Sequence, residues 1–336
     1  MTTYKEVFGK YVRSVSSDPP TAAGSGEIWY NTTSNTFKLM TLQGAWSSGG
    51  NLGNARGWMG SAGDKTAGII FGGSLNPYVS LTGITEEYNG SSWTGGGTSP
   101  IAKLGSTGAG TQTAALMFGG GSPYVSTTQE YDGSSWTGGG NMGNASRDRA
   151  PAGTQTAALG MTGYRPGSQG TTTSEEYNGS SWTAITNAGT ARYYGAGLGV
   201  STSAIVAGGT APPTSNKNNA ELWNGSSWTA VANLPGNISV AQAGGTTSDG
   251  CVFGGIGSPY YPSYPKRTTK SDWDGSSWST SPASMSTARA FFGGAASSSP
   301  SVYATGGVTN GSPTYIASTE ELGVGTTGVI KTLTTS

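Results

Sequence analysis

Short apolar runs that close on a pair of glycines recur along most of the chain. Ile69-Ile70-Phe71 is the first such run, and runs of the same kind precede the later pairs. The pairs are Gly72-Gly73, Gly119-Gly120, Gly208-Gly209, Gly254-Gly255 and Gly306-Gly307, with an eroded version at Leu159-Gly160-Met161-Thr162-Gly163. Apolar runs this short, bounded by glycine, are typical of buried β-strands, and no stretch shows a sustained period of 3.6 residues. The pattern predicts six units of β-structure and almost no helix.

A second, polar pattern repeats in step with the first. An aromatic residue is followed by Asn-Gly or Asp-Gly, which favour a tight hairpin turn, and then by Ser-Ser-Trp. The copies begin at Tyr88, Tyr131, Tyr177, Trp223 and Trp273, and their tryptophans are 43 to 50 residues apart. A degenerate copy, Gln43-Gly44-Ala45-Trp46, lies upstream. Each unit therefore contains a small-residue strand, the apolar strand, a strand ending in an aromatic residue and the Trp strand.

Four antiparallel strands per unit of this length are typical of a β-propeller blade. Small Gly, Ala, Ser and Thr side chains suit the crowded innermost strands, and we expect the repeated tryptophans to be mostly buried between blades. The glycine pair, the Tyr and the Trp recur together in register, and in this the chain resembles the kelch repeat over about residues 48–322. The predicted fold class is all-β: a six-bladed kelch-like β-propeller with a short N-terminal anchor and hairpin.

The ends of the chain lie outside the repeats. Residues 1–25 are predicted to be a docking segment and linker, residues 26–47 a β-hairpin and closing strand, and residues 323–336 a C-terminal strand or tail. The sixth unit lacks its own Gly-Ser-Ser-Trp strand. Ring propellers often complete their last blade with a terminal strand, which removes an open sheet edge. We predict that residues 42–48 supply this strand, with Trp46 in the repeated Trp site; the alternative is Val329–Leu333.

Charged side chains also follow the repeat. The acids are Glu87, Glu130, Glu176, Glu221, Asp272 and Glu321, and the bases are Arg56, Lys103, Arg147, Arg192 and Arg289. Each unit has one acid and, except for the fifth, one base; this indicates structural ion pairs, because charged groups in a protein interior need partners. A residue type that recurs in every unit indicates a structural role rather than a single active site.

Composition excludes several classes of chemistry. The chain has no histidine, which excludes Ser-His-Asp and Cys-His catalytic sites and argues against catalytic zinc or copper. Galactose oxidase, a kelch propeller enzyme, requires histidine ligands, and the sialidase Asp box is not present. Net charge is zero and charged residues make up 10% of the chain, so no basic surface for nucleic acid and no membrane insertion are expected. Cys251 is expected to be a buried, inert thiol. We predict a protein that is not an enzyme and has no cofactor; a depolymerase using loop carboxylates is the weaker alternative.

The loops between the second and third strands of each unit carry the sequence variety. They span residues 74–84, 121–128, 164–173, 210–219, 256–270 and 308–318, and propeller topology places them on one face. Their candidate ligand-binding residues are Tyr78, Tyr124, Tyr164, Arg165, Tyr260, Tyr261, Tyr264, Lys266, Arg267 and Tyr315. Tyrosine offers a flat apolar face and a hydroxyl, which suits sugar rings and protein partners. The alternative is that these loops pack on one another and protect their own backbone.

Three further features of the sequence are similar to bacteriophage proteins. Gly26-Glu27-Ile28-Trp29-Tyr30-Asn31-Thr32-Thr33 resembles modules near the start of phage tail fibres. The Gly-Thr-Gln-Thr-Ala-Ala-Leu segments at 110–116 and 153–159, and the ending Lys331–Ser336, resemble kelch-like virion proteins of marine phages. The resemblance implies a virion appendage on the exterior of the particle, present in multiple copies. It would contact other virion proteins through the N-terminal segment and a host-surface glycan or protein through the propeller. A secreted or cell-surface carbohydrate-binding lectin is the alternative.

Overall fold

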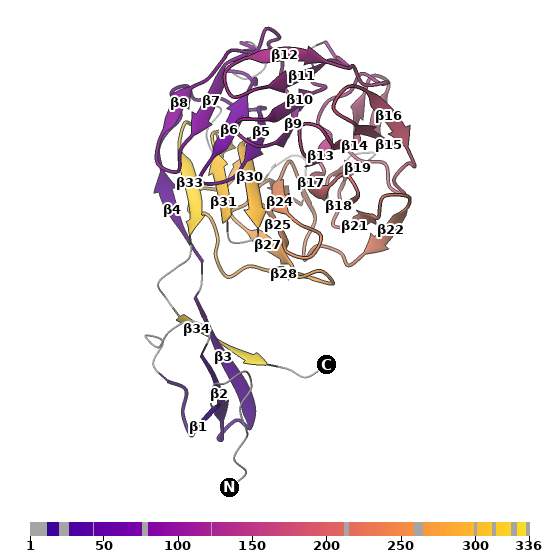
Figure 1. The fold of residues 1–336 in the computed structure, drawn as a ribbon. Coiled ribbons are helices and arrows are strands. Elements are labelled where there is room, and N and C mark those ends of the chain that lie inside the picture. The colour runs from indigo at the N-terminus through magenta and orange to yellow at the C-terminus, as the bar shows by residue number, and fades with distance from the viewer. Residues whose placement is uncertain are drawn as a thin grey trace. The chain divides into compact units, whose positions relative to one another are not determined.

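The computed structural model describes residues 12–19, 27–42, 44–75, 80–121, 123–211, 215–258, 265–298, 301–310, 314–323 and 328–333. All named elements in these ranges are β-strands (Figure 1). The chain divides into two compact units. The larger comprises Trp46–Leu322, and the smaller combines Met1–Ala45 with Gly323–Ser336. This division differs from the predicted one, because the two ends of the chain form one unit together.

The larger unit contains six four-stranded antiparallel sheets among its described residues. The first sheet is β5 (Gly60–Gly63), β6 (Gly68–Phe71), β7 (Thr85–Tyr88) and β8 (Trp93–Gly95). The second is β9 (Thr107–Gly110), β10 (Ala115–Phe118), β11 (Thr128–Tyr131) and β12 (Trp136–Gly139). The third is β13 (Ala150–Gly153), β14 (Ala158–Arg165), β15 (Ser168–Tyr177) and β16 (Trp182–Ile185). The fourth is β17 (Ala196–Val200), β18 (Ser203–Ala207), β21 (Ala220–Trp223) and β22 (Trp228–Val231). The fifth is β24 (Gln242–Gly245), β25 (Gly250–Phe253), β27 (Lys270–Trp273) and β28 (Trp278–Thr280). The sixth is β30 (Gly293–Ser298), β31 (Ser301–Thr305), β33 (Thr319–Gly323) and β4 (Ala45–Gly49).

The six sheets form a closed ring. Their innermost strands contact one another in the order β5, β9, β13, β17, β24 and β30, and β30 in turn contacts β5 (Figure 1). Glycine lets these strands approach closely: a Cβ on Gly108 would lie 2.2 Å from the carbonyl oxygen of Ser61 in the neighbouring sheet. The small-residue strands of the repeat are therefore the inner strands, as the sequence pattern indicated, because no larger side chain fits there.

The last sheet takes its outer strand from the N-terminal side of the chain. β4 lies next to β33, which is the first of the two arrangements considered from the sequence. Trp46 packs against the cluster that includes Phe253 of the fifth sheet, with ring centroids 6.0 Å apart. Trp136 and Trp182 pack against Phe71 and Phe118 of their preceding sheets in the same way. The rival strand, β34 (Gly328–Leu333), pairs instead with β3 (Thr36–Leu42) in the smaller unit.

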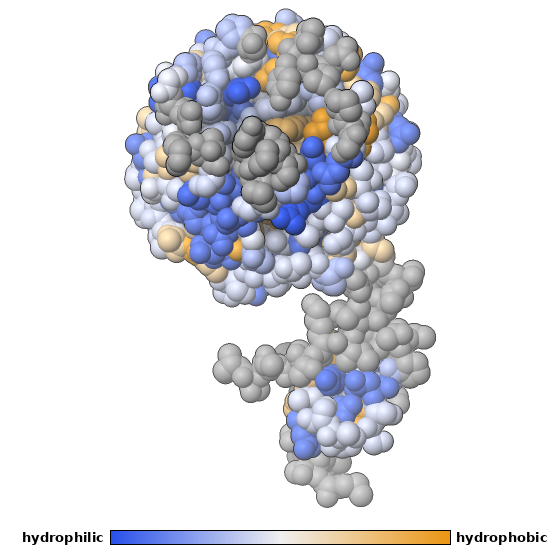
Figure 2. Space-filling view, turned by 180° about the vertical axis from the view of Figure 1, so that it is seen from behind, coloured by the Kyte–Doolittle hydropathy of each residue, from blue (hydrophilic) through white to orange (hydrophobic). Residues whose placement is uncertain are grey.

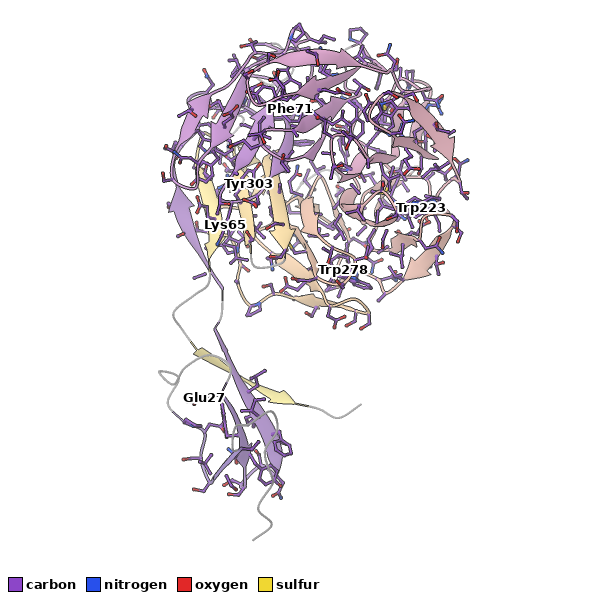
Figure 3. The ribbon with its side chains drawn as sticks, viewed as in Figure 1. Glu27, Lys65, Phe71, Trp223, Trp278 and Tyr303 are labelled. Atoms are coloured by element: carbon purple, nitrogen blue, oxygen red, sulfur yellow. The ribbon has the colours of Figure 1, made fainter. Side chains whose placement is uncertain are left out.

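Aromatic side chains pack between adjacent sheets, and Figure 3 labels Phe71, Trp223, Trp278 and Tyr303 among them. The aromatic residue before each turn lies deepest, and Tyr88, Tyr131 and Tyr177 have no exposed surface. Of the repeated tryptophans, Trp136 and Trp278 are buried, and the others are partly buried. The expectation that most of these indoles are buried was therefore too strong. Three of them donate their N–H to a threonine of the preceding sheet: Trp93 to Thr319, Trp136 to Thr85 and Trp182 to Thr128, at 2.8–2.9 Å.

Buried ion pairs recur around the ring, in most cases at a different position from the predicted one. The paired acid lies two residues before the position of the strand's aromatic residue, so in the first, third and sixth sheets it is one position earlier than the predicted Glu87, Glu176 and Glu321, whereas in the fourth sheet the predicted pair Arg192–Glu221 is confirmed. The pairs are Arg56–Glu86, Arg149–Glu175, Arg192–Glu221 and Arg289–Glu320. In each, the second carboxylate oxygen accepts a backbone N–H, for example from Gly53 at 2.7 Å and from Ser286 at 2.6 Å. Each pair thus connects the third strand of a sheet to the segment that precedes the first strand of the same sheet.

One predicted base behaves differently, and the fifth sheet, for which no base was predicted, forms a pair of another kind. Arg149, rather than Arg147, pairs with Glu175 in the third sheet, while Arg147 contacts Asp148 at 3.2 Å. In the fifth sheet, Asp272 pairs with Lys270 of its own strand.

The acid position chosen from the sequence has another role at three sheet boundaries. Tyr131 donates its hydroxyl hydrogen to Glu87, Tyr177 to Glu130 and Tyr88 to Glu321. Each bond crosses from one sheet to the next. Burial, together with the hydrogen bond to the carboxylate, raises the pKa of Tyr131 and of Tyr177 to about 12. Adjacent strand residues point to opposite faces, which is why neighbouring acids serve an intra-sheet pair and an inter-sheet bond.

The second sheet lacks a carboxylate at the ion-pair position, and this suggests a stabilising substitution. Lys103 is 2% exposed, and its Nζ donates to Thr127 Oγ1 at 3.1 Å. Gln129 occupies the position that Glu86 has in the first sheet. Burial lowers the pKa of Lys103 to about 8. We expect Gln129→Glu to raise the free energy of unfolding at pH 7 by about 2 kcal/mol, because a charged hydrogen-bond partner is added.

The pH dependence distinguishes this explanation from a general effect. In the wild type, the folded state binds fewer protons than the unfolded state between pH 8 and the ordinary lysine pKa, so stability rises with pH there. The advantage of Gln129→Glu is therefore largest below pH 8 and shrinks above it. Thermal unfolding at pH 7 and pH 9.5 measures this, and an equal gain at both values would contradict the ion-pair explanation.

The smaller unit is one four-stranded sheet in the order β1-β2-β3-β34. β1 (Arg13–Val15) pairs in parallel with β2 (Ile28–Asn31), and β2 and β3 form the predicted hairpin. Asp18 accepts hydrogen bonds from Trp29 Nε1 at 2.9 Å and from Asn31 Nδ2 at 2.7 Å. Arg13–Val15 are thus a strand of this sheet and Asp18 is bonded to β2, which corrects the linker prediction for these residues. Residues 1–11 and 20–26 lie outside the described ranges.

Candidate binding face

The second-to-third-strand loops and the entry to each inner strand meet at the same end of the ring. Backbone bridges join the two, as in Gly57 with Ser74, Leu104 with Gly121 and Arg147 with Tyr164. The fourth, fifth and sixth sheets show the same pairing, in part through the short strands β19 (Thr210–Ala211), β20 (Ser215–Asn216), β23 (Ile238–Ser239), β26 (Ile256–Gly257), β29 (Arg289–Ala290) and β32 (Val308–Thr309). We call this end of the larger unit the loop face.

Six residues around the ring axis at the loop face are linked by five backbone hydrogen bonds, and we call them the belt. They are the residues just before the inner strands: Trp58, Gly105, Asp148, Tyr194, Val240 and Phe291. Trp58 N donates to Phe291 O, and each later residue through Val240 donates to the one before it, at 2.8–3.1 Å. All six have left-handed backbone, with φ between 54° and 62°. Five of them are not glycine, and left-handed backbone in such residues is strained and is often found at functional sites.

Aromatic side chains from the belt gather at one end of the central cavity. Trp58 and Phe291 stack with centroids 3.9 Å apart, and Tyr194 contacts both edge-on at 5.8 and 5.9 Å. The cavity behind them has a volume of about 190 Å³ and is lined by glycine, alanine and other small residues of all six inner strands. The aromatic cluster is therefore the part of the lining that lies at the loop face, and Leu198 is a larger side chain within an inner strand.

Asp148 is the acidic member of the belt, and its carboxyl group is buried beside Arg147. Burial raises the pKa of Asp148 to about 7, although the Arg147 charge and a hydrogen bond from Tyr194 act in the opposite direction. A carboxyl group in this state changes protonation near neutral pH.

This shift makes stability depend on pH in a direction that can be tested. Between the ordinary aspartate pKa and pH 7, the folded state keeps a proton that the unfolded state releases, so stability falls as pH rises. Asp148→Asn removes this dependence. We expect the variant to gain about 2 kcal/mol relative to wild type between pH 5 and pH 7. Chemical unfolding at the two pH values measures it, and a constant difference between the proteins would contradict a raised pKa.

Two of the predicted loop tyrosines lie together beside the belt. Tyr124 and Tyr164 come from adjacent sheets and stack with centroids 5.8 Å apart and planes 15° apart. The Arg147 guanidinium lies 5.4 Å and 5.2 Å from these rings and 5.7 Å from Trp58. Such cation–π contacts hold aromatic rings in place. Both tyrosines keep part of their surface exposed. The loops thus do pack on one another, as the alternative held, yet they leave aromatic surface open to solvent.

The third sheet presents its residues on a hairpin instead of the predicted loop. β14 and β15 continue to Arg165 and from Ser168, so most of the range 164–173 is strand. The ladder has register shifts between Met161 and Gly163 and between Gly163 and Arg165. Arg165 donates to Asn144 Oδ1, and Asn144 Nδ2 donates to Glu175 Oε1 at 3.0 Å. The hairpin places Tyr164 beside Tyr124 of the second sheet. Arg165 reaches Asn144, whose segment runs alongside the residues that follow Tyr124, because Met142 N donates to Ser126 O and Ser146 N donates to Val125 O.

The remaining predicted residues do not join this cluster within the described ranges. Tyr315 is 7% exposed and packs with Trp58 and Leu104, so its ring is core instead of surface. Arg267 donates to Ser258 O at 3.4 Å, and Lys266 N donates to Asn310 Oδ1 at 3.1 Å. Tyr78, Tyr260, Tyr261 and Tyr264 lie outside the described residues.

Sequence reasoning missed Trp58, Arg147, Asp148, Tyr194 and Phe291 as members of the loop face. Trp58 falls outside the register of the repeated tryptophans, and this was the available signal. Figure 2 shows one face of the larger unit, on which hydrophobic atoms lie close to strongly hydrophilic ones.

Three further observations concern chemistry. Cys251 is fully buried, and burial raises the pKa of its thiol to about 12, in agreement with the inert thiol expected from the sequence. Across the described ranges, His, Cys, Asp and Glu side chains do not gather in threes as metal ligands would. In the part of the chain that the structure describes, no helical segment has the length and apolar character of a membrane-spanning helix.

Comparison with known proteins bears on the fold. No family model matches the sequence, and no curated protein matches it. Among solved structures, the chain is similar to the protein titled "Structure of YjhT", with a TM-score of 0.66 and 13% sequence identity. The match covers 84% of this chain and 99% of that chain. At this identity the likeness concerns the fold alone, and it confirms the predicted all-β fold of the β-propeller type.

Proposed function

We propose that this chain is a non-enzymatic attachment protein on the exterior of a bacteriophage particle. The larger unit binds a host-surface glycan or protein through its loop face, and the smaller unit joins the chain to other virion proteins. The observation that carries the proposal is the Tyr124–Tyr164–Arg147 cluster. Flat rings held by a cation on a rigid scaffold are suited to binding, since little conformational entropy is lost when a ligand is bound.

The division into two units supports the attachment role. Both ends of the ring's chain lead into the smaller sheet, where β3 and β34 pair side by side. Two covalent connections resist separation better than one. The phage-like Gly26–Thr33 segment belongs to this smaller unit, which is therefore the unit that we assign to the particle.

Two measurements test the proposal together. Immunogold labelling with antibodies to the purified full-length chain is expected to mark the surface of intact particles. The same purified chain is expected to compete with those particles for adsorption to host cells. If the particles are labelled but the purified chain does not compete for adsorption, the chain has a structural role in the virion and the attachment role is rejected. Glycan binding by a chain that is absent from particles would instead favour the lectin.

A further inference from the structure

The Tyr124–Tyr164 pair lies beside an excess of positive charge. Arg147 and Arg165 are both partly exposed, and Asp148 is the acid in direct contact with Arg147. The nearby carboxylate of Glu175 is buried and pairs with Arg149. The chain as a whole has zero net charge, so a surface with two guanidinium groups beside one acid differs from the average.

Arg165 is also held in position by its neighbours. Its Nη2 donates to Asn144, and Asn144 is in turn bonded to buried Glu175. A guanidinium has five N–H donors, so the Asn144 bond leaves others for a ligand. Because the side chain is already ordered, a second partner costs less entropy than it would at a flexible surface arginine. Arginine recognises planar carboxylates through paired hydrogen bonds.

We propose that Tyr124, Tyr164 and Arg165 form a subsite for a sugar residue that carries a carboxylate, such as a uronate. The apolar face of the sugar ring packs on the tyrosines, and the carboxylate binds Arg165. This inference rests on the proposed function and names the class of receptor for the same face. A neutral sugar would use the rings but not the arginine. Nucleic acid would require a longer basic surface than two arginines provide.

The test uses the full chain and two matched probes. One is an oligogalacturonate of defined length, and the other is the same oligomer with its carboxylates converted to methyl esters. Isothermal titration calorimetry is expected to show at least about tenfold tighter binding of the acid form, because a charge-assisted bond is lost in the ester. The acid form should also weaken as salt is raised.

Three variants assign the effect to residues. Arg165→Gln is expected to remove the preference for the acid form while weak binding of both probes remains. Tyr164→Ala is expected to weaken both probes about tenfold or more. Lys217→Gln, a basic residue in the corresponding loop of the fourth sheet, is the control and is expected to bind like wild type. Thermal midpoints of all four proteins check that the ring remains folded.

The outcomes separate this inference from the proposed function. Equal affinity for acid and ester, no binding of either probe, or an Arg165→Gln variant that keeps its preference would overturn the acidic-sugar subsite. If competition for host adsorption persists in that case, attachment stands and its receptor is of another class. Acid-selective binding by a chain that is absent from particles would uphold the subsite and reject the virion role.

Discussion

We expect deletion of residues 1–49 to destroy the stable fold of the larger unit. This deletion removes β4, so β33 becomes an open edge and the sixth sheet keeps three strands. It also removes Trp46, which packs against Phe253 and closes the last sheet boundary. Trp46 is partly buried, so its loss costs less than the ~3–5 kcal/mol of a fully buried aromatic side chain, and this cost adds to the loss of the strand ladder.

A second truncation provides the matched control. Deleting residues 1–42 and 324–336 removes most of the smaller unit but keeps β4. Circular dichroism and thermal unfolding should show a cooperative transition for this protein and none for the first. If both proteins melt at the midpoint of the full-length chain, β4 does not close the ring.

The second large effect is expected from the buried pair of the sixth sheet. Arg289 has no exposed surface and also donates to the carbonyl groups of Gly306 and Ser318. Arg289→Ala leaves Glu320, which is 3% exposed, without its cation. Removal of one partner of a buried pair costs about 3–5 kcal/mol, because the other charge stays buried and uncompensated.

The loss should depend on pH in a defined direction. Burial by itself raises the pKa of Glu320, but hydrogen bonds from Ser286 and Arg289 and the Arg289 charge lower it below its usual value. The stability that this carboxylate contributes is therefore present above its unfolded pKa and is lost as pH falls. Urea unfolding at pH 7 and pH 4 should show a larger difference between wild type and Arg289→Ala at pH 7. Lys217→Ala, which removes a basic side chain outside such a pair, should change stability by less than about 0.5 kcal/mol. A similar small change in Arg289→Ala would mean that the pair contributes little.

The acidic residues of the third strands show what the sequence pattern could not predict. The repeat placed Glu86 and Glu87 next to each other on the third strand, and the base in the same unit was evident. Which of the two neighbours binds Arg56 depends on the face that each side chain occupies in the sheet. In the fourth sheet the sequence reads Ala-Glu-Leu-Trp, so Glu221 was grouped with Glu87 although it occupies the Glu86 position. The pleat and the ladder register decide this, and spacing along the chain does not.

The candidate site also combines residues that the sequence indicated with residues that only the tertiary structure brings together. Tyr124, Tyr164 and Arg165 could be selected because tyrosine and arginine in variable loops are suited to binding. Their association with Arg147 and Trp58 was not evident, since these residues come from three different sheets. Tyr315 was selected by the same argument and is buried.

By itself, the sequence determined the strands, their order within each unit and the turns between them. These features depend on neighbours a few residues apart: the glycine pairs, the Asn-Gly and Asp-Gly turns and the alternation of small and apolar strands. The tertiary structure decided between the predicted strand β4 and the alternative β34 for the sixth sheet, and it alone decided which acids form the buried pairs and that six residues with left-handed backbone lie around the axis. These features arise when the ring closes, because closure brings together segments that are far apart in sequence and gives each side chain a partner that no local pattern specifies.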